Sequence, residues 1–177
     1  MSNQWLVDGS HSNAHFSVRH MMITNVRGEF QKVEGKVTWD PAKPEATQIE
    51  ASVDVGSLNT RDAQRDGHLK SADFFDVEKF PKLTFKSKSV KAKGKENLTV
   101  VGDLTIHGVT KEVTLDVEGP SPASVDPFGN TRVGATASTK IKRDEFGMVW
   151  NAALEAGGVL VGNDVNVTID ISLIQQK

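Results

Sequence analysis

The sequence predicts an all-β domain of eight antiparallel strands, and two observations carry this prediction. Apolar and polar residues alternate along most of the chain, which is typical of strands with one buried face. Turn-forming residues separate the alternating segments, as in antiparallel hairpins. Eight such strands form either a sandwich or a closed barrel, and closure removes exposed sheet edges. A barrel of this size can also hold a small ligand.

The last predicted strand has the clearest alternation. Apolar residues from Val165 to Leu173 alternate there with polar residues from Asp164 to Ser172. Three further segments between residues 82 and 118 are separated by turns at 93–95 and 107–108, which predicts a meander. The remaining strands are expected at 14–20, 26–39, 47–55 and 131–141.

Two segments interrupt the strand pattern. Residues 61–70 follow Thr60, a residue that can cap a helix, and contain an early acid, so we expect a short helix between strands 3 and 4. Residues 142–147 are expected to form one helical turn. The proline- and glycine-containing stretches 119–122 and 126–130 are expected to be loops.

Small residues on one predicted strand bear on whether the barrel interior is open. The inner face of the strand at 131–141 carries Val133, Ala135, Ala137, Thr139 and Ile141. Several of these side chains are too small to fill a barrel axis, which favours a cavity. The alternative is that large side chains opposite them fill the space, as close packing in protein interiors requires.

Length and composition limit the possible functions. The 177 residues suit a single domain spanning 1–177, and no cysteine is available for disulfides or thiolate chemistry. The 21 basic and 23 acidic side chains give a formal charge of -2, and both signs are scattered along the chain, so no polycationic surface for nucleic acid or anionic membrane is expected.

The chain contains no run of about 18 apolar residues, so we expect no stable membrane insertion. The start of the sequence lacks the basic and apolar stretches of a secretion signal. The expected location is therefore cytoplasmic for the chain as written, or periplasmic if the chain is already processed.

A set of short motifs, in this order along the chain, resembles the YceI family. The resemblance extends from about Trp5 to Leu173. The motifs are Asp8–Ser12, Phe16–Met22, Val26–Phe30, Thr60–Arg61 with Arg65–Leu69, Asp73–Asp76, Lys79–Pro81, Gly102–Thr110 and Arg143–Gly147. The ordered set is specific, although each motif alone is weak.

The resemblance implies an eight-stranded lipocalin-like barrel that binds, stores or transports a long-chain amphiphilic lipid in its lumen. A polyisoprenoid quinone or its precursor is the implied ligand, and a homodimer is the implied assembly. The family has no agreed catalytic residues, so the resemblance implies no catalytic site and no required cofactor.

Apolar residues on the strands and after the predicted helix are the candidate ligand contacts. Aromatic and methionine side chains suit an adaptable apolar wall. The alternative for the cluster of Leu69, Phe74, Phe75 and Phe80 is a satellite core under a long connection. The predicted ligand-binding residues are Phe16, Val18, Met22, Phe30, Leu69, Phe74, Phe75, Phe85, Leu104, Ile106, Ala135, Ala137, Ile141 and Phe146.

Two alternatives to lipid binding remain open at the level of sequence, an enzyme and an interaction module. An enzyme acting on an isoprenoid substrate needs a base near a nucleophile, but the chain has no Gly-x-Ser-x-Gly motif. The five histidines lack a recognised metal-ligand spacing, so no metal site is expected. An interaction module would have a lumen filled by side chains and would bind a protein on its outer surface.

Overall fold

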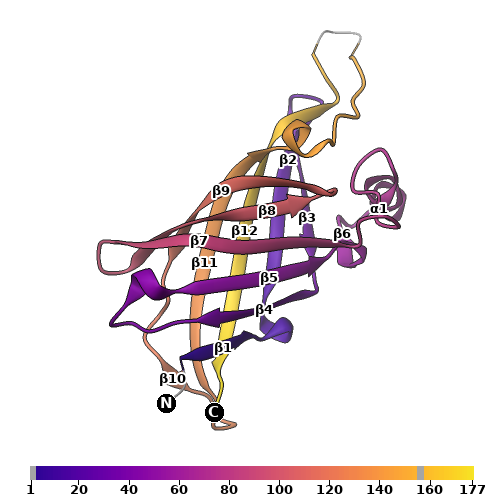
Figure 1. Ribbon diagram of the computed structural model, residues 1–177. Helices are drawn as coiled ribbons and strands as arrows, with labels where there is room; N and C mark the ends of the chain where they lie inside the picture. Colours follow the sequence, from indigo (N-terminus) through magenta and orange to yellow (C-terminus); the bar gives the residue numbers. More distant parts are fainter. Residues whose placement is uncertain (1–2, 155–157) are drawn as a thin grey trace.

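Alternating residues form the strands that they predict, and the strands close into a barrel. The computed structural model describes residues 3–154 and 158–177, which form one twelve-stranded sheet (Figure 1). The strands are β1 (Gln4–Val7), β2 (Asn13–His20), β3 (Thr24–Phe30), β4 (Val33–Thr38), β5 (Gln48–Asp54), β6 (Leu58–Asn59), β7 (Lys82–Lys93), β8 (Asn97–Ile106), β9 (Val109–Glu118), β10 (Ser124–Val125), β11 (Thr131–Lys142) and β12 (Val161–Gln175). The helices are α1 (Ala63–Lys70) and the short 3-10 helices η1 (Gly9–His11), η2 (Pro44–Ala46), η3 (Val55–Ser57) and η4 (Arg143–Phe146).

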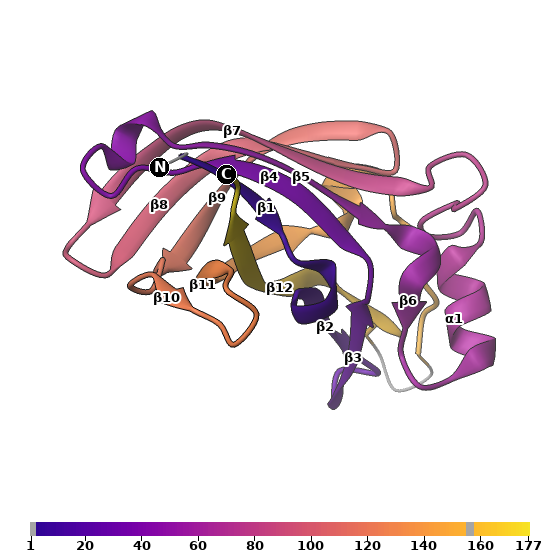
Figure 2. The ribbon, with the colours of Figure 1, turned by 90° about the horizontal axis from the view of Figure 1, so that it is seen from below.

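The closed antiparallel barrel of eight strands confirms the predicted fold class. The pairing order around the ring is β12, β1, β4, β5, β7, β8, β9 and β11, and β11 pairs with β12 again to complete it. Figure 2 shows β4, β5 and β7 curving over β11 and β12. Closure leaves one long interior face, to which each strand contributes alternate side chains.

The fifteen-residue strand β12 connects two levels of the structure. Its last residues pair with β1, and residues 161–170 pair with β2. Beyond β2 the sheet continues through β3 to the short β6. The β2–β3 hairpin therefore extends the wall above β1, at the end of the molecule opposite the two termini (Figure 1).

The single strand predicted at 26–39 is two strands, β3 and β4. The break falls at Gln31 and Lys32, whose backbone N–H groups donate to the Ser57 hydroxyl oxygen at 3.0 and 3.1 Å. These two donors are therefore satisfied by a side chain from η3 instead of by a neighbouring strand. The alternation of apolar and polar residues cannot predict a contact between residues so far apart in the sequence.

The predicted helix at 61–70 is present as α1, but its cap is not Thr60. The Asp62 side chain accepts hydrogen bonds from the backbone N–H groups of Gln64 and Arg65, as an N-cap residue does. The Thr60 hydroxyl instead donates to Asp66 and accepts from the Arg65 guanidinium. The helical turn expected at 142–147 is confirmed as η4.

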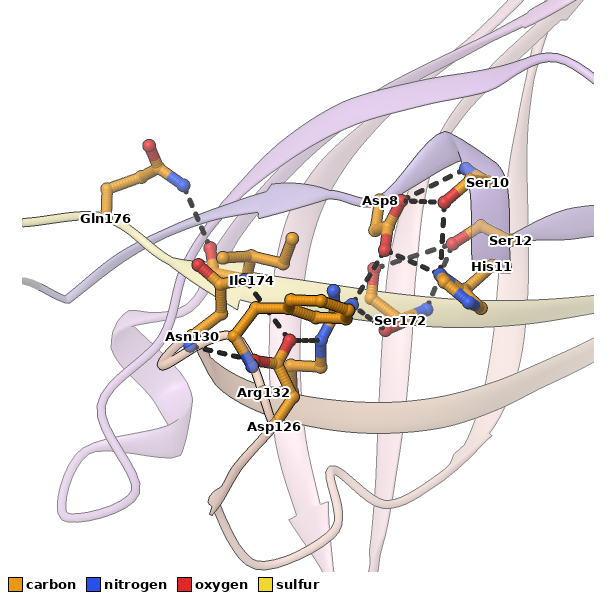
Figure 3. Close-up of polar contacts among 11 residues, drawn as sticks. Asp8, Ser10, His11, Ser12, Asp126, Asn130, Arg132, Ser172, Ile174 and Gln176 are labelled. Atoms are coloured by element: carbon orange, nitrogen blue, oxygen red, sulfur yellow. Dashed lines mark hydrogen bonds and ion pairs between the residues drawn. The ribbon is translucent and has the colours of Figure 1, made fainter.

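A charged network holds the lower end of the barrel, which we call the tied end (Figure 3). The Arg132 guanidinium on β11 donates to Asp8 at 2.7 Å and to Asp126 at 2.5 Å. It also donates to the Ser172 hydroxyl on β12. The hydrogen bonds from Arg132 hold the pKa values of Asp8 and Asp126 well below the usual carboxyl range. One arginine thus joins the first loop, the β10–β11 loop and β12.

Candidate functional site

An elongated apolar cavity of about 610 Å³ occupies the barrel interior. Its volume lies within the range of about 300–1,000 Å³ typical of small-molecule sites. The inward side chains of Val100, Leu115, Val167 and Ile169 are among those that line it. The interior is therefore open, although the sequence left a filled lumen as an alternative.

Most of the residues predicted to contact a ligand line this cavity. Their role in binding stays a prediction, because lining describes only their position. The lining residues of the predicted set are Phe16, Val18, Phe30, Leu69, Phe74, Phe75, Phe85, Leu104, Ile106, Ala135, Ala137 and Ile141.

The structure places two residues of the predicted set away from the cavity. Met22 lies in the turn after β2, with 56% of its surface exposed, because β2 ends at His20. Phe146 is fully buried in η4, where it packs with Ile106 and Ile141 behind the cavity wall. Neither local turn directs its side chain into the cavity.

The small residues on β11 have the predicted orientation. Ala135, Ala137 and Thr139 line the cavity, and Ala137 also belongs with Val133 to the buried cluster that contains Leu173. Because alanine projects only a methyl group, this side of the barrel leaves space that larger residues would fill.

Two wall phenylalanines lie over glycines. A methyl group built on Gly28 would collide with the ring of Phe16, its cross-strand partner. A methyl group on Gly102 would likewise collide with the ring of Phe85. The missing side chains let both rings lie along the wall.

Aromatic side chains gather at the other end of the cavity, which we call the mouth end. The ring centroid of His68 on α1 lies 4.7 Å from that of Trp150 and 5.1 Å from that of Phe74, with edge-on geometry in both pairs. His68 Nε2 is 2.9 Å from the Asp73 carboxylate. All of these residues except Asp73 line the cavity. Trp150 is not in the predicted set, because it lies outside the alternating segments and no motif singled it out.

Arg143 fixes the segment that carries Trp150. Its guanidinium donates to the backbone oxygens of Met148, Trp150 and Gly162 at 2.8 Å each, and to that of Val161 at 3.2 Å. The side chain is only 5% exposed, and burial lowers its pKa. The carboxylate of the adjacent Asp144 opposes this shift without outweighing it. Arg143 therefore places a largely buried positive charge beside the cavity.

Ser10, His11 and Asp8 lie together at the tied end but do not form a catalytic triad (Figure 3). His11 Nδ1 is 3.0 Å from the Ser10 hydroxyl and 2.8 Å from the Asp8 carboxylate. A triad uses opposite ring nitrogens for these two contacts, so the serine proton has no route through this histidine. The Asp8 side chain also accepts from the Ser10 backbone, which is the contact of a cap on η1.

The described residues include no cluster of three metal-ligating side chains. Among the same residues, no helix is long and apolar enough to cross a membrane.

Comparisons with known proteins agree with this architecture. A UPF0312 protein of Staphylococcus aureus is 41% identical over 158 residues, which cover 89% of this chain and 90% of that protein. The YCEI protein of Campylobacter jejuni has a similar structure, with a TM-score of 0.76, 29% identity and 90% coverage of both chains.

A polyisoprenoid binding domain from Saccharophagus degradans has the same fold. Its TM-score is 0.70 at 15% identity, with coverage of 97% of this chain and 98% of that domain. The model of the YceI-like domain matches residues 5–173 of this chain. The chain therefore belongs to the YceI-like domain family.

Proposed function

We propose that this chain binds a long-chain polyisoprenoid lipid, a quinone or its precursor, with the tail inside the barrel. The observation that carries the proposal is the continuous apolar cavity of about 610 Å³ that runs between the strands. The Saccharophagus degradans domain, which has this fold and is described as polyisoprenoid binding, supports the same ligand class.

Burial of the tail supplies the binding energy in this proposal. Each buried methylene contributes roughly 0.8 kcal/mol, so a tail of about 20 carbons gains on the order of 16 kcal/mol before costs. Ordering the tail and restricting its translation offset a large part of this gain. Tight binding then needs few polar contacts, and the cavity selects tails by girth.

The proposed polar head group lies at the mouth end, where the lining changes character. His68, Arg65 and Gln64 on α1 line the cavity there, as do Arg143 and Trp150. The cavity next to the tied end is instead lined by residues such as Val37, Trp39 and Leu173. An amphiphile therefore fits in one orientation, with its head toward α1.

Native mass spectrometry of protein purified without organic solvent tests the proposal. We expect one prenyl lipid per chain, released chemically unchanged on extraction, and renewed uptake by the stripped protein. A stripped, folded protein that takes up neither prenyl alcohol nor prenyl quinone contradicts binding. Release of a chemically altered lipid supports the enzyme alternative. The homodimer and the cellular location stay predictions.

A further inference from the structure

The turn between β2 and β3 exposes three consecutive apolar side chains. Met21, Met22 and Ile23 are 44%, 56% and 71% exposed. Met21 and Met22 also have φ angles of 51° and 63°, in the left-handed region that glycine and asparagine adopt more readily. Neither burial nor backbone preference favours methionine here, so stability of the fold does not explain this tip.

The tip continues onto the chain that precedes β12. The Met21 N–H donates to the Leu160 oxygen at 2.7 Å, and the Met22 sulfur lies against Gly158. Val159, between these two residues, is 43% exposed. We define the mouth patch as Met21, Met22, Ile23 and Val159.

The mouth patch adjoins the cavity directly. His20 and Leu160, the chain neighbours of Met21 and Val159, both line the cavity. The β2–β3 turn lies at the end of the molecule opposite the termini (Figure 1). The mouth patch therefore lies next to residues that line the cavity.

The part of the β2–β3 hairpin nearest the tip is basic. Residues 19–27 contain Arg19, His20 and Arg27 but no acidic residue. Basic and exposed apolar side chains thus lie together on this hairpin, while Asp164 lies on the neighbouring strand β12. This combination is typical of segments that rest in the interface of an anionic membrane.

We propose that the mouth patch docks reversibly on an anionic lipid bilayer, so that lipid passes between bilayer and cavity without crossing water. The cargo in this proposal rests on the proposed function. A long apolar tail is costly to expose to water, so direct contact between the mouth and the bilayer gives it an apolar path. The patch has four residues, whereas a stable protein interface uses about 20–30 on each side. A bilayer suits so small a tip better than a second protein does.

Flotation with vesicles of equal parts phosphatidylcholine and phosphatidylglycerol, free of prenyl lipid, tests docking alone. We expect the intact chain to float with these vesicles and not with phosphatidylcholine alone. The double variant Met22→Ser/Ile23→Ser should bind these vesicles at least about tenfold more weakly, because two apolar side chains no longer enter the interface. Ile23→Ser alone should reduce binding without altering a left-handed residue.

Phe128→Ser is the matched control. Phe128 is 88% exposed but lies in the β10–β11 loop beside Asp126, at the tied end. Vesicle binding by this variant should equal that of the unaltered chain. An unaltered chain that fails to float, or an equal loss in Phe128→Ser, overturns the proposal. The proposal is also overturned if the unaltered chain does not bind vesicles but self-associates, and Met22→Ser/Ile23→Ser abolishes that self-association.

Uptake of a prenyl alcohol from detergent micelles separates docking from the proposed function. The mouth-patch variant should load from micelles as the unaltered chain does, while its transfer to and from vesicles slows. If the unaltered chain floats but never loads, docking stands and the proposed cargo is wrong.

Discussion

Each end of the barrel is held by one arginine, but the two arginines have different partners. Arg132 at the tied end faces two carboxylates, Asp8 and Asp126, so positive and negative charges balance there. At the mouth end, the Arg143 guanidinium donates its hydrogen bonds to backbone oxygens and lies over the Phe74 ring. The comparison teaches that the same side chain can join strands through charge at one end and shape an irregular segment through neutral acceptors at the other.

The largest effect is expected at the mouth end. Arg143→Met leaves four backbone oxygens without their donor in a buried site, which should lower the free energy of unfolding by about 3 kcal/mol or more. Denaturant titration of the stripped protein measures this loss. Arg143→Lys, which keeps the charge but loses the planar fork, should recover only part of it. A loss no larger than that of an exposed arginine contradicts the anchoring role.

A smaller loss that depends on pH is expected at the tied end. Arg132→Gln should lower the melting temperature at neutral pH, because Asp8 and Asp126 lose their common donor. Their pKa values lie below the usual value in the folded chain, so the network stabilises above the unfolded pKa of about 3.9 and loses this contribution as pH falls further. The difference in melting temperature between the variant and the unaltered chain should therefore become smaller in strong acid. A difference that becomes larger there would refute the stabilising role of the Asp8–Arg132–Asp126 network.

The cavity between the two ends should tolerate added volume. Ala137→Phe should change the free energy of unfolding of stripped protein by less than about 1 kcal/mol, below the usual cost of overpacking a filled core. Prenyl-lipid uptake should fall, and added lipid should raise the melting temperature less than in the unaltered chain. Severe unfolding would place Ala137 in close packing, and normal uptake would place it outside the ligand path.

The smallest effect has the opposite sign. Met22→Gly should raise the free energy of unfolding by about 0.5–1 kcal/mol, since glycine adopts a positive φ without the steric cost of a side chain. The same change should weaken vesicle binding. Thermal melts and flotation on one preparation measure both. A destabilised Met22→Gly variant would show that Met22 contributes to packing after all.

The regular wall of the barrel could be predicted from the sequence, because its signal is local. The alternation from Val165 to Leu173 appears as inward and outward faces of β12, and the meander of β7, β8 and β9 appears where the turns predict it. The inward alanines of β11 followed from the same periodicity.

The two ends could not be predicted, because their contacts join distant parts of the chain. Ser57 interrupts the β3–β4 strand from 25 residues or more away, and Arg132 reaches Asp8 across 124 residues. The exposed position of Met22 could not be predicted either, because the alternation does not show that β2 ends at His20. The motif Arg143–Gly147 does not show what Arg143 contacts, since its hydrogen-bond acceptors are backbone oxygens.

The glycines beneath Phe16 and Phe85 give the wall a property that its side chains alone do not explain. Each ring occupies space that a side chain at the glycine would otherwise take. A methyl group at Gly102 would meet the backbone oxygen of Lys86 as well as the Phe85 ring, whereas one at Gly28 would meet only side chains. A larger residue at position 28 would therefore displace the Phe16 ring without replacing any residue that lines the cavity. Relatives with this barrel could thus differ in the width of the cavity while the residues that line it stay the same.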